Sequence, residues 1–178
     1  MAREVWTIGH STRTLEEFFG LLHAHDIAVL ADVRRFPGSK RYPHFGSDAL
    51  AESARAEGIR YIRLPALGGR RTPRRDSPNT GWKNAAFRAY ADHVGTPEFA
   101  EGVDELTDAA AGSRLAFMCA EAVWWRCHRR IISDVLTVQG WEVRHILDAN
   151  APALHRLDAP AHLVDGALSY EPVGSPGI

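Results

Sequence analysis

The side chains best suited to chemistry lie between residues 118 and 130. This stretch holds both cysteines of the chain, Cys119 and Cys127, with a carboxylate, an imidazole and several guanidinium groups. A thiolate is a nucleophile, and nearby guanidinium groups stabilise thiolates and bind anions. The stretch begins where an apolar run, 115–119, gives way to a helical pattern. Because open α/β sheets bind ligands where a strand ends and a helix begins, we predict a site here.

Cys119 is the candidate nucleophile of this site. The N–H groups at the start of a following helix would stabilise its thiolate. Glu121 acts in the opposite sense, since a nearby carboxylate raises the pKa of a thiol. The alternative interpretation is that Cys119 is a small buried hydrophobic residue.

Cys127 and His128 lie at the start of a helix predicted over 126–139, next to Arg129. A helix N-terminus with several arginines binds phosphate or sulfate. A basic, solvated first turn is the alternative, although arginine there opposes the helix dipole unless an anion lies close by. The two cysteines lack the short spacing of structural zinc motifs, so we predict neither a metal nor another cofactor.

Further polar residues follow two earlier apolar runs: His10 and Ser11 follow the first, and Asp32 and Arg34 end the second. In a parallel sheet these positions and Glu121 leave their strands at one edge, so we predict that they converge in one crevice. Asp32 or Glu121 would act as general acid or base, and His10 would orient or move a proton. The structural alternative is an ion pair between Asp32 and Arg34, with His10 capping a helix.

The segment 65–82 is long and irregular, and loops of this kind inside compact domains are more often functional than decorative. It contains Arg70 and Arg71, which we predict to help Arg34 and Arg129 hold an anion. Trp82 ends the segment and would supply a ring for stacking beside these guanidinium groups. Its alternative role is to anchor the loop in the core.

Alternating strands and helices must position these residues. The pattern of apolar residues, which alternates over 59–64, predicts five strands, at 5–9, 27–33, 59–64, 115–119 and 141–147. Helical patterns separate them, beginning at Thr14 and covering 47–57, 84–94, a segment from Pro97 onward, and 126–139. This alternation implies parallel pairing through crossover helices. We predict one three-layer, Rossmann-like α/β domain over 1–148 with about five strands, and a C-terminal extension over 149–178 packed on it or trailing from it.

Composition limits the class of protein. A chain of 178 residues with 45% hydrophobic content fits one globular domain, and a net charge of −1 disfavours a protein that coats polyanions. The charge is uneven, because residues 32–75 hold eleven basic and four acidic side chains, whereas 98–108 holds five acidic and no basic ones. This distribution favours an anionic ligand at a defined place, with a solvated charged surface as the alternative.

The sequence predicts a cytoplasmic protein with no membrane partner. No apolar run approaches the roughly 20 residues that a membrane span needs. The first residues lead directly into a strand pattern without the apolar core of a signal peptide. Two cysteines without an export signal indicate a reducing compartment, in which thiols stay free.

Several motifs together resemble one family, the bacterial and archaeal domain-of-unknown-function family 488. The resemblance extends over nearly the whole chain to about His145. It is carried by Thr7 to Ser11, Asp32 to Arg34 with Pro37 and Ser39, Leu67 to Gly69, Phe87 to Ala91, Met118 to Glu121, and Cys127 to Arg129. The resemblance implies a compact α/β domain whose motif residues form one site, and it implies no assigned activity.

These observations favour an enzyme that acts on an anionic substrate, a nucleotide or a component of nucleic acid, in a pocket at the sheet edge. A non-catalytic nucleic-acid-binding or regulatory module that uses the basic segment 34–75 is the alternative. A weaker alternative is rhodanese-like transfer of sulfur or phosphoryl groups through Cys119. It rests on analogy of position, and no compact anion-binding loop of Gly and Arg follows this cysteine.

Overall fold

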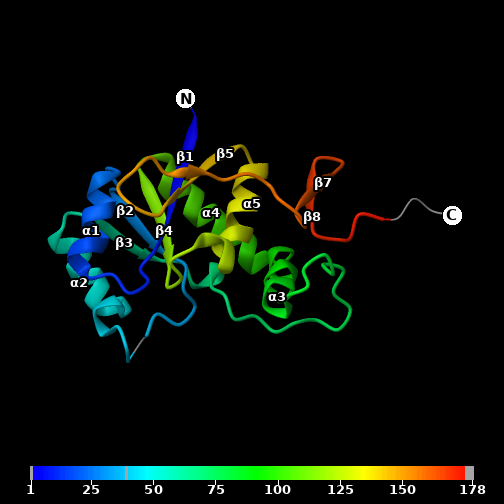
Figure 1. Cartoon of the computed structure of the whole chain (residues 1–178), viewed down its shortest axis with the longest axis horizontal. Helices are drawn as coiled ribbons and strands as arrows, with labels where there is room; N and C mark the ends of the chain where they lie inside the picture. Colours follow the sequence, from blue (N-terminus) through cyan, green and yellow to red (C-terminus); the bar gives the residue numbers. More distant parts are fainter. Residues whose placement is uncertain (1, 39, 175–178) are drawn as a thin grey trace.

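A computed structural model describes residues 2–38 and 40–174, so the motif residue Ser39 lies outside the described residues. Its main sheet has six strands in the order β3-β2-β4-β1-β5-β6 (Figure 1). The strands are β1 Arg3–Gly9, β2 Val29–Asp32, β3 Arg60–Arg63, β4 Leu115–Cys119, β5 Trp141–Ile146 and β6 Ala153–Leu154. The first five are parallel and β6 is antiparallel to β5. The predicted, mainly parallel sheet is confirmed, with one strand more than expected.

Five helices connect these strands, and local sequence sets where they begin. They are α1 Leu15–Ala24, α2 Ser47–Ala56, α3 Ala85–Val94, α4 Pro97–Ala111 and α5 Arg129–Val138. Thr14 begins α1 with a capping box, in which its hydroxyl and the Glu17 carboxylate satisfy two free N–H groups. Thr96 caps α4 through its hydroxyl alone, and Pro97 occupies the first helical position.

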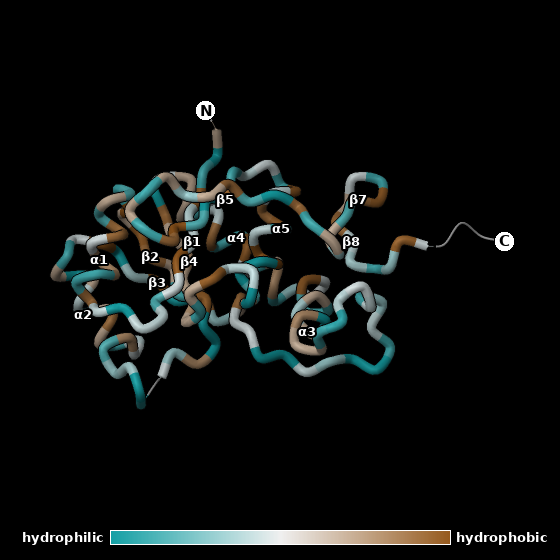
Figure 2. Tube along the Cα trace, viewed as in Figure 1, coloured by the Kyte–Doolittle hydropathy of each residue, from teal (hydrophilic) through white to brown (hydrophobic). Residues whose placement is uncertain are grey.

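Helices cover both faces of the sheet, which gives the predicted three layers (Figure 1). Side chains of neighbouring strand residues point to opposite faces. Trp6 and Ile8 therefore pack with residues of α1 and α2, whereas Val5 packs with residues of α4 and α5. Figure 2 shows the resulting pattern, with hydrophobic strands enclosed and a hydrophilic loop running outside them from residue 68 to α3.

The connections around β1 and β4 create a switch point in the sheet. These two strands are neighbours, with Gly9 opposite Cys119. After β1 the chain passes beyond β4 to reach β2, and after β4 it passes beyond β1 to reach β5. Their connections therefore leave in opposite directions, and a crevice opens at the carboxyl ends of such a strand pair.

Helix α5 begins three residues later than predicted. Trp124–Arg126 forms a separate 3-10 turn, η3, and Cys127 is extended with φ −136° and ψ 170°. The helix then begins at Arg129, with His128 at the N-cap position. The prediction was wrong because the spacing of apolar residues does not distinguish one 3-10 turn from the start of an α-helix. Consequently Cys127 lies in front of α5 rather than inside its first turn.

The segment after β5 returns to the sheet. It adds β6 and then forms a hairpin from β7, His162–Val164, and β8, Ala167–Ser169. These strands are short and mostly exposed, so they leave no alternating pattern in the sequence. His155 and Tyr170 of this segment are buried. Among the described residues, no helix has both the length and the apolar character required to cross a membrane.

Candidate thiol site at the carboxyl edge of the sheet

A pocket of about 210 Å³ lies at the carboxyl ends of β2 and β4. Six of the predicted site residues line it: Arg34, Arg70, Cys119, Glu121, Cys127 and His128. Arg35, Phe36 and Gly69 complete much of its wall. Pockets for drug-sized ligands measure about 300–1,000 Å³, so this one fits a small anion or one charged group of a larger molecule.

Two free cysteines and one arginine form the inner wall of the pocket. The Sγ atoms of Cys119 and Cys127 lie 3.1 Å apart. The Nε–H group of Arg129 points at both, 2.9 Å from the Cys119 sulfur and 3.3 Å from the Cys127 sulfur. The backbone N–H of Arg129 also donates to the Cys127 sulfur, at 3.3 Å. Cys127 therefore receives donors from three directions, which is an arrangement that suits a thiolate.

The two thiols have opposite pKa shifts. Burial raises the pKa of Cys119 well above its ordinary value, and the neighbouring Cys127 sulfur reinforces that shift. Burial opposes ionisation of Cys127 as well, but the hydrogen bond from Cys119 and the charge of Arg129 lower its pKa well below the ordinary value. These directions favour a pair that holds one negative charge, with Cys127 as the thiolate and Cys119 as the S–H donor.

Arg129 is used entirely within the protein, although it was predicted to hold an anion. Its side chain is only 1% exposed. Besides the two sulfurs, Nη1 donates to the hydroxyl of Thr7 at 3.0 Å and Nη2 donates to the carbonyl of Glu121 at 2.7 Å. The guanidinium thus holds both sulfurs and fixes the loop after β4, and it does not line the pocket.

A chain of buried hydrogen bonds continues from Thr7 into the C-terminal segment. The Thr7 hydroxyl lies 2.8 Å from His145 Nδ1, and His145 Nε2 lies 2.9 Å from His155 Nδ1. His155 Nε2 then lies 2.7 Å from Asp134, whose other carboxylate oxygen accepts from Tyr170 at 2.7 Å. Burial, with His155 next to it, lowers the pKa of His145 well below its usual range.

Sequence reasoning missed this buried chain. Its members belong to β1, α5, β5 and the segment after β5, and no spacing pattern relates them. A buried position for a histidine in a strand was the only signal available, and it does not identify a partner. The ring of Trp124, stacked at 4.1 Å on that of His145, closes the chain from one side.

His128 lies on the pocket wall with a defined tautomer. Its Nε2 lies 2.8 Å from the carbonyl oxygen of Val33, so in the neutral ring Nε2 carries the hydrogen and Nδ1 carries the lone pair. Burial lowers its pKa below the usual value, which favours that neutral ring. Gly69 faces Nδ1, where a Cβ would lie only 3.1 Å away. The residue next to Cys127 therefore carries an unprotonated nitrogen, Nδ1, that faces Gly69.

Asp32 lies below the pocket and is fully buried in an ion pair with Arg34. Its Oδ1 accepts from Arg34 Nε at 2.9 Å and its Oδ2 from Nη2 at 2.7 Å. The Tyr61 hydroxyl donates to the same carboxylate, and Arg34 Nη2 also reaches the carbonyl of Phe45. The geometry matches the structural alternative, because no free oxygen of Asp32 faces the pocket, and we leave it out of the proposed chemistry.

His10 and Ser11 do not line the pocket. His10 is 3% exposed and stacks on Phe45 with ring centroids 4.3 Å apart, while its Nδ1 lies 2.9 Å from the Ser11 carbonyl. Ser11 has a φ of 48° and its N–H donates to the carbonyl of Ala120. Just before them, a Cβ on Gly9 would overlap the Glu121 carbonyl oxygen, so glycine is needed for the close approach of the two loops. Both residues support the crevice from the α1 side.

Burial of His10 predicts a loss of stability in acid. Burial, assisted by the charge of Arg34, lowers its pKa from 6.5 to about 4. Below pH 6.5 His10 is protonated in the unfolded chain but stays neutral in the folded protein down to about pH 4. The free energy of unfolding therefore falls from pH 6.5 down to about pH 4, by about 3 kcal/mol at pH 4. Urea unfolding from pH 7 to 4 measures it, with His10→Asn as the matched variant. Equal pH slopes in both proteins would contradict the assignment.

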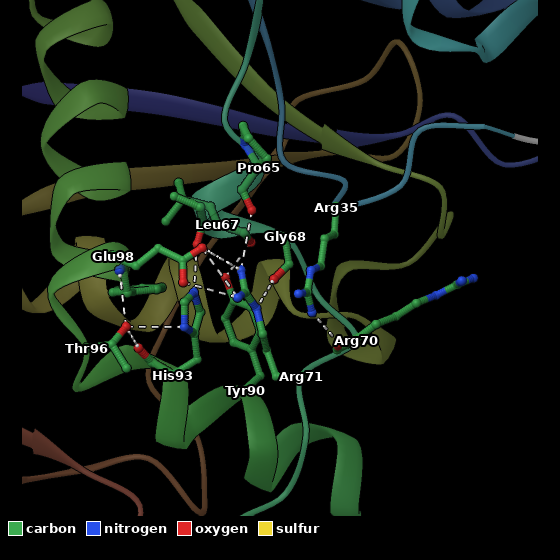
Figure 3. A network of polar contacts seen from close by, with 12 residues as sticks. Arg35, Pro65, Leu67, Gly68, Arg70, Arg71, Tyr90, His93, Thr96 and Glu98 are labelled. Atoms are coloured by element: carbon green, nitrogen blue, oxygen red, sulfur yellow. Dashed lines mark hydrogen bonds and ion pairs between the residues drawn. The ribbon is translucent and has the colours of Figure 1, made fainter.

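Arg71 and Arg70 are adjacent but have different surroundings. Arg71 points into the protein, where it donates to the carbonyls of Pro65, Ala66 and Gly68 and pairs with Glu98 at 3.3 Å (Figure 3). It therefore holds the 3-10 turn η2, Pro65–Leu67, rather than facing the pocket. The Arg70 side chain points away from this network into open space (Figure 3). Among the described residues its guanidinium has no hydrogen-bond or ion-pair partner, so it is available to an anion.

Trp82 lies in the core, away from the pocket. It is 6% exposed and stacks on Phe87 with centroids 4.7 Å apart. The guanidinium of Arg130 lies 4.8 Å from its ring centroid. This arrangement matches the anchoring alternative, because both faces of the indole are covered.

The opposite end of the strands carries a wider hollow of about 710 Å³. It is lined by Trp6, Arg114, Trp141 and neighbouring residues, and it holds neither cysteine. In parallel sheets ligands bind at the carboxyl ends, so the smaller thiol pocket is the better candidate. In the described part of the chain, no group of three or more His, Cys, Asp or Glu side chains is arranged to hold a metal ion.

Together these features define an α/β protein of the Rossmann-like type, with a thiol pocket at the carboxyl ends of β2 and β4, next to the switch point of a parallel sheet. The family model described as "Domain of unknown function DUF488" matches residues 14–136, and the chain belongs to that family. No curated protein and no solved structure matches the chain. The matched segment includes Cys119, Cys127 and Arg129, whereas Thr7 and His145 lie outside it.

Proposed function

We propose that the protein is a small enzyme that acts on an anionic substrate through the thiolate of Cys127. The observation that carries this proposal is the fully buried Arg129, whose Nε–H group bonds both sulfurs on the pocket wall. Burying a guanidinium is costly, and packing two cysteines as hydrophobic residues does not require one. An arginine held on a thiol pair is instead a means of keeping a sulfur ionised.

The residues of the pocket divide the chemistry between them. The Cys127 sulfur attacks the substrate, and Arg70 with Arg35 attracts its negative charge. His128 Nδ1 accepts or returns a proton, because its hydrogen is held on the other ring nitrogen. Glu121, exposed at the rim, is a second candidate for proton transfer.

A substrate larger than the pocket would extend over its rim. Phe36 lines the pocket, is 61% exposed and lies under the guanidinium of Arg35, which is 5.3 Å from its ring centroid. An exposed ring beside an arginine stacks on a nucleobase. This supports a nucleotide, or a component of nucleic acid, whose phosphate enters the pocket.

The two alternative functions receive less support. Three of the eleven basic side chains of the segment 34–75 are paired within the protein: Arg34 with Asp32, Arg71 with Glu98 and Arg74 with Asp76. Together with the net charge of −1 for the chain, this disfavours a broad nucleic-acid-binding surface. Sulfur or phosphoryl transfer through Cys119 is disfavoured because Cys119 is the protonated member of the pair.

Alkylation of the two cysteines tests the proposal. Cys127 is expected to react with iodoacetate with an apparent pKa below the ordinary value of about 8.5, and Cys119 to stay slow. The rate ratio of anionic iodoacetate to neutral iodoacetamide should exceed that of free cysteine, and inorganic phosphate should slow both reactions. Peptide mass spectrometry of native protein between pH 5 and 10 measures this.

Single variants serve as the controls for alkylation. Cys119→Ser should leave a reactive Cys127, whereas Cys127→Ser should leave only slow alkylation. A Cys127 that reacts only after unfolding would remove the thiolate from the proposal. If Cys127 is alkylated with the ordinary pKa of a thiol, Arg129 does not keep its sulfur ionised.

A further inference from the structure

Cys119 and Cys127 are placed so that their sulfurs can bond to each other. Their separation of 3.1 Å exceeds a disulfide bond of about 2.05 Å by only about 1 Å. One cysteine ends β4 and the other precedes α5, so a small movement of the loop between them would close this gap. Both sulfurs line the pocket, and a small reagent that enters it meets them together.

We propose that these two thiols form a dithiol–disulfide couple that reduces an anionic low-molecular-weight disulfide. The inference rests on the proposed function, since it uses the same thiolate and names its substrate class. Cys127, 8% exposed, is the attacking thiol, and Cys119, 2% exposed and behind it, is the resolving thiol.

The reaction balances in two exchanges. The Cys127 thiolate attacks one sulfur of the substrate, which forms a mixed disulfide and releases one substrate thiolate. Cys119 gives its proton to His128 Nδ1 or to the released thiolate, and its sulfur attacks the Cys127 sulfur. The second substrate thiolate then leaves. The protein is oxidised by two electrons, the substrate is reduced to two thiols, and a small dithiol returns the protein to its reduced form.

The buried Arg129 indicates that the protein disulfide would be reactive rather than structural. In the reduced pair the guanidinium faces a thiolate, whereas in the disulfide that negative charge is gone. The arginine would then keep only Thr7 and the Glu121 carbonyl as partners in a buried site. Stabilising the reduced form makes a couple more oxidising, so the protein disulfide should be easily reduced, and an excess of substrate disulfide is needed to convert all of the protein to its oxidised form.

The charge of the pocket selects the substrate. Arg35 and Arg70 lie at its rim, and Arg70 has no polar side-chain partner among the described residues (Figure 3). Together they outnumber the single acid on the wall, Glu121. A disulfide that bears carboxylates is therefore attracted, and one that bears ammonium groups is repelled.

The test compares oxidised glutathione, which is anionic, with cystamine, which is cationic, each added at the same large excess over fully reduced protein. Wild type is expected to release two glutathione molecules per chain, to end lighter by two hydrogens and to carry no adduct. Cys119→Ser should retain one glutathione on Cys127. Glutathione disulfide should react several-fold faster than cystamine, each rate being divided by that of free cysteine with the same disulfide. Arg70→Gln should remove most of that preference, by slowing the reaction with glutathione disulfide and speeding the reaction with cystamine.

The outcomes separate the two proposals. A wild-type protein that keeps glutathione on Cys127 would overturn the couple while leaving the thiolate enzyme in place. Equal normalised rates for both disulfides would overturn the anionic substrate class. If Cys127 reacts with neither disulfide and with no iodoacetate in the native state, both the couple and the proposed function fall.

Discussion

Replacing Arg129 by methionine is expected to destabilise the protein and to remove its reactive thiolate. The substitution leaves a buried thiolate, the Thr7 hydroxyl and the Glu121 carbonyl without their shared donor. Breaking a buried charge pair from one side costs about 3 to 5 kcal/mol. The pKa of Cys127 should rise past the ordinary thiol value of about 8.5, and alkylation at pH 7 should fall at least about tenfold.

Urea unfolding and thiolate absorbance measured against pH test this prediction. Arg129→Lys is the matched variant, because it keeps the positive charge. Its side chain offers one donor nitrogen to these partners, whereas the arginine side chain offers three. It should be intermediate in stability and should retain a partly lowered pKa for Cys127. An unchanged thiolate titration in either variant would show that the guanidinium does not control the thiol pair.

Replacing Asp32 by alanine is expected to cause a loss of similar size without involving the thiols. Arg34, 8% exposed, would keep its charge in a buried site with only the Phe45 carbonyl as acceptor. Tyr61 would lose its acceptor as well. Leaving the guanidinium uncompensated is expected to lower the free energy of unfolding by about 3 to 5 kcal/mol, measured by urea unfolding at pH 7.

Two further variants separate the charge from the packing. Tyr61→Phe removes one hydrogen bond to the carboxylate and should cost about 1.5 to 3 kcal/mol. The double variant Asp32→Leu with Arg34→Met removes both charges, and it should recover most of the stability lost in Asp32→Ala. A cost below about 1 kcal/mol for Asp32→Ala would mean that the ion pair does not hold the β2 edge together.

The sheet was predictable because its five parallel strands alternate with helices and carry a regular pattern of apolar residues. Strands β1, β2, β4 and β5 are inside the sheet, whereas β3 is at its edge and was found through its alternating pattern. Strand β6 could not be found in this way, since its two residues are exposed and pair only through the backbone. The start of α5 was also misplaced, because one 3-10 turn before it has a similar spacing.

The edge of the sheet at which the pocket lies was predictable from the sequence, but the arrangement of the side chains around the pocket was not. Strand ends located Cys119 and Arg34 at the correct edge of the sheet. Whether a guanidinium there binds substrate or protein depends on contacts between distant segments. Arg71 folds back onto η2 and Arg129 onto the sulfurs, whereas Arg70 stays open, and the residue types are the same. The 3.1 Å contact between the sulfurs likewise needs the turn between β4 and α5, which no spacing rule describes.

With both rings neutral and Asp134 ionised, the hydrogens of the buried chain behind Arg129 have one consistent arrangement. The carboxylate only accepts, so His155 gives it the Nε2 hydrogen and accepts at Nδ1 from His145 Nε2. His145 Nδ1 then accepts from the Thr7 hydroxyl, which itself accepts from Arg129. The Asp134 carboxylate thus fixes the tautomers of His145 and His155. Through the Thr7 hydroxyl it also fixes the orientation of the Arg129 guanidinium on the sulfurs.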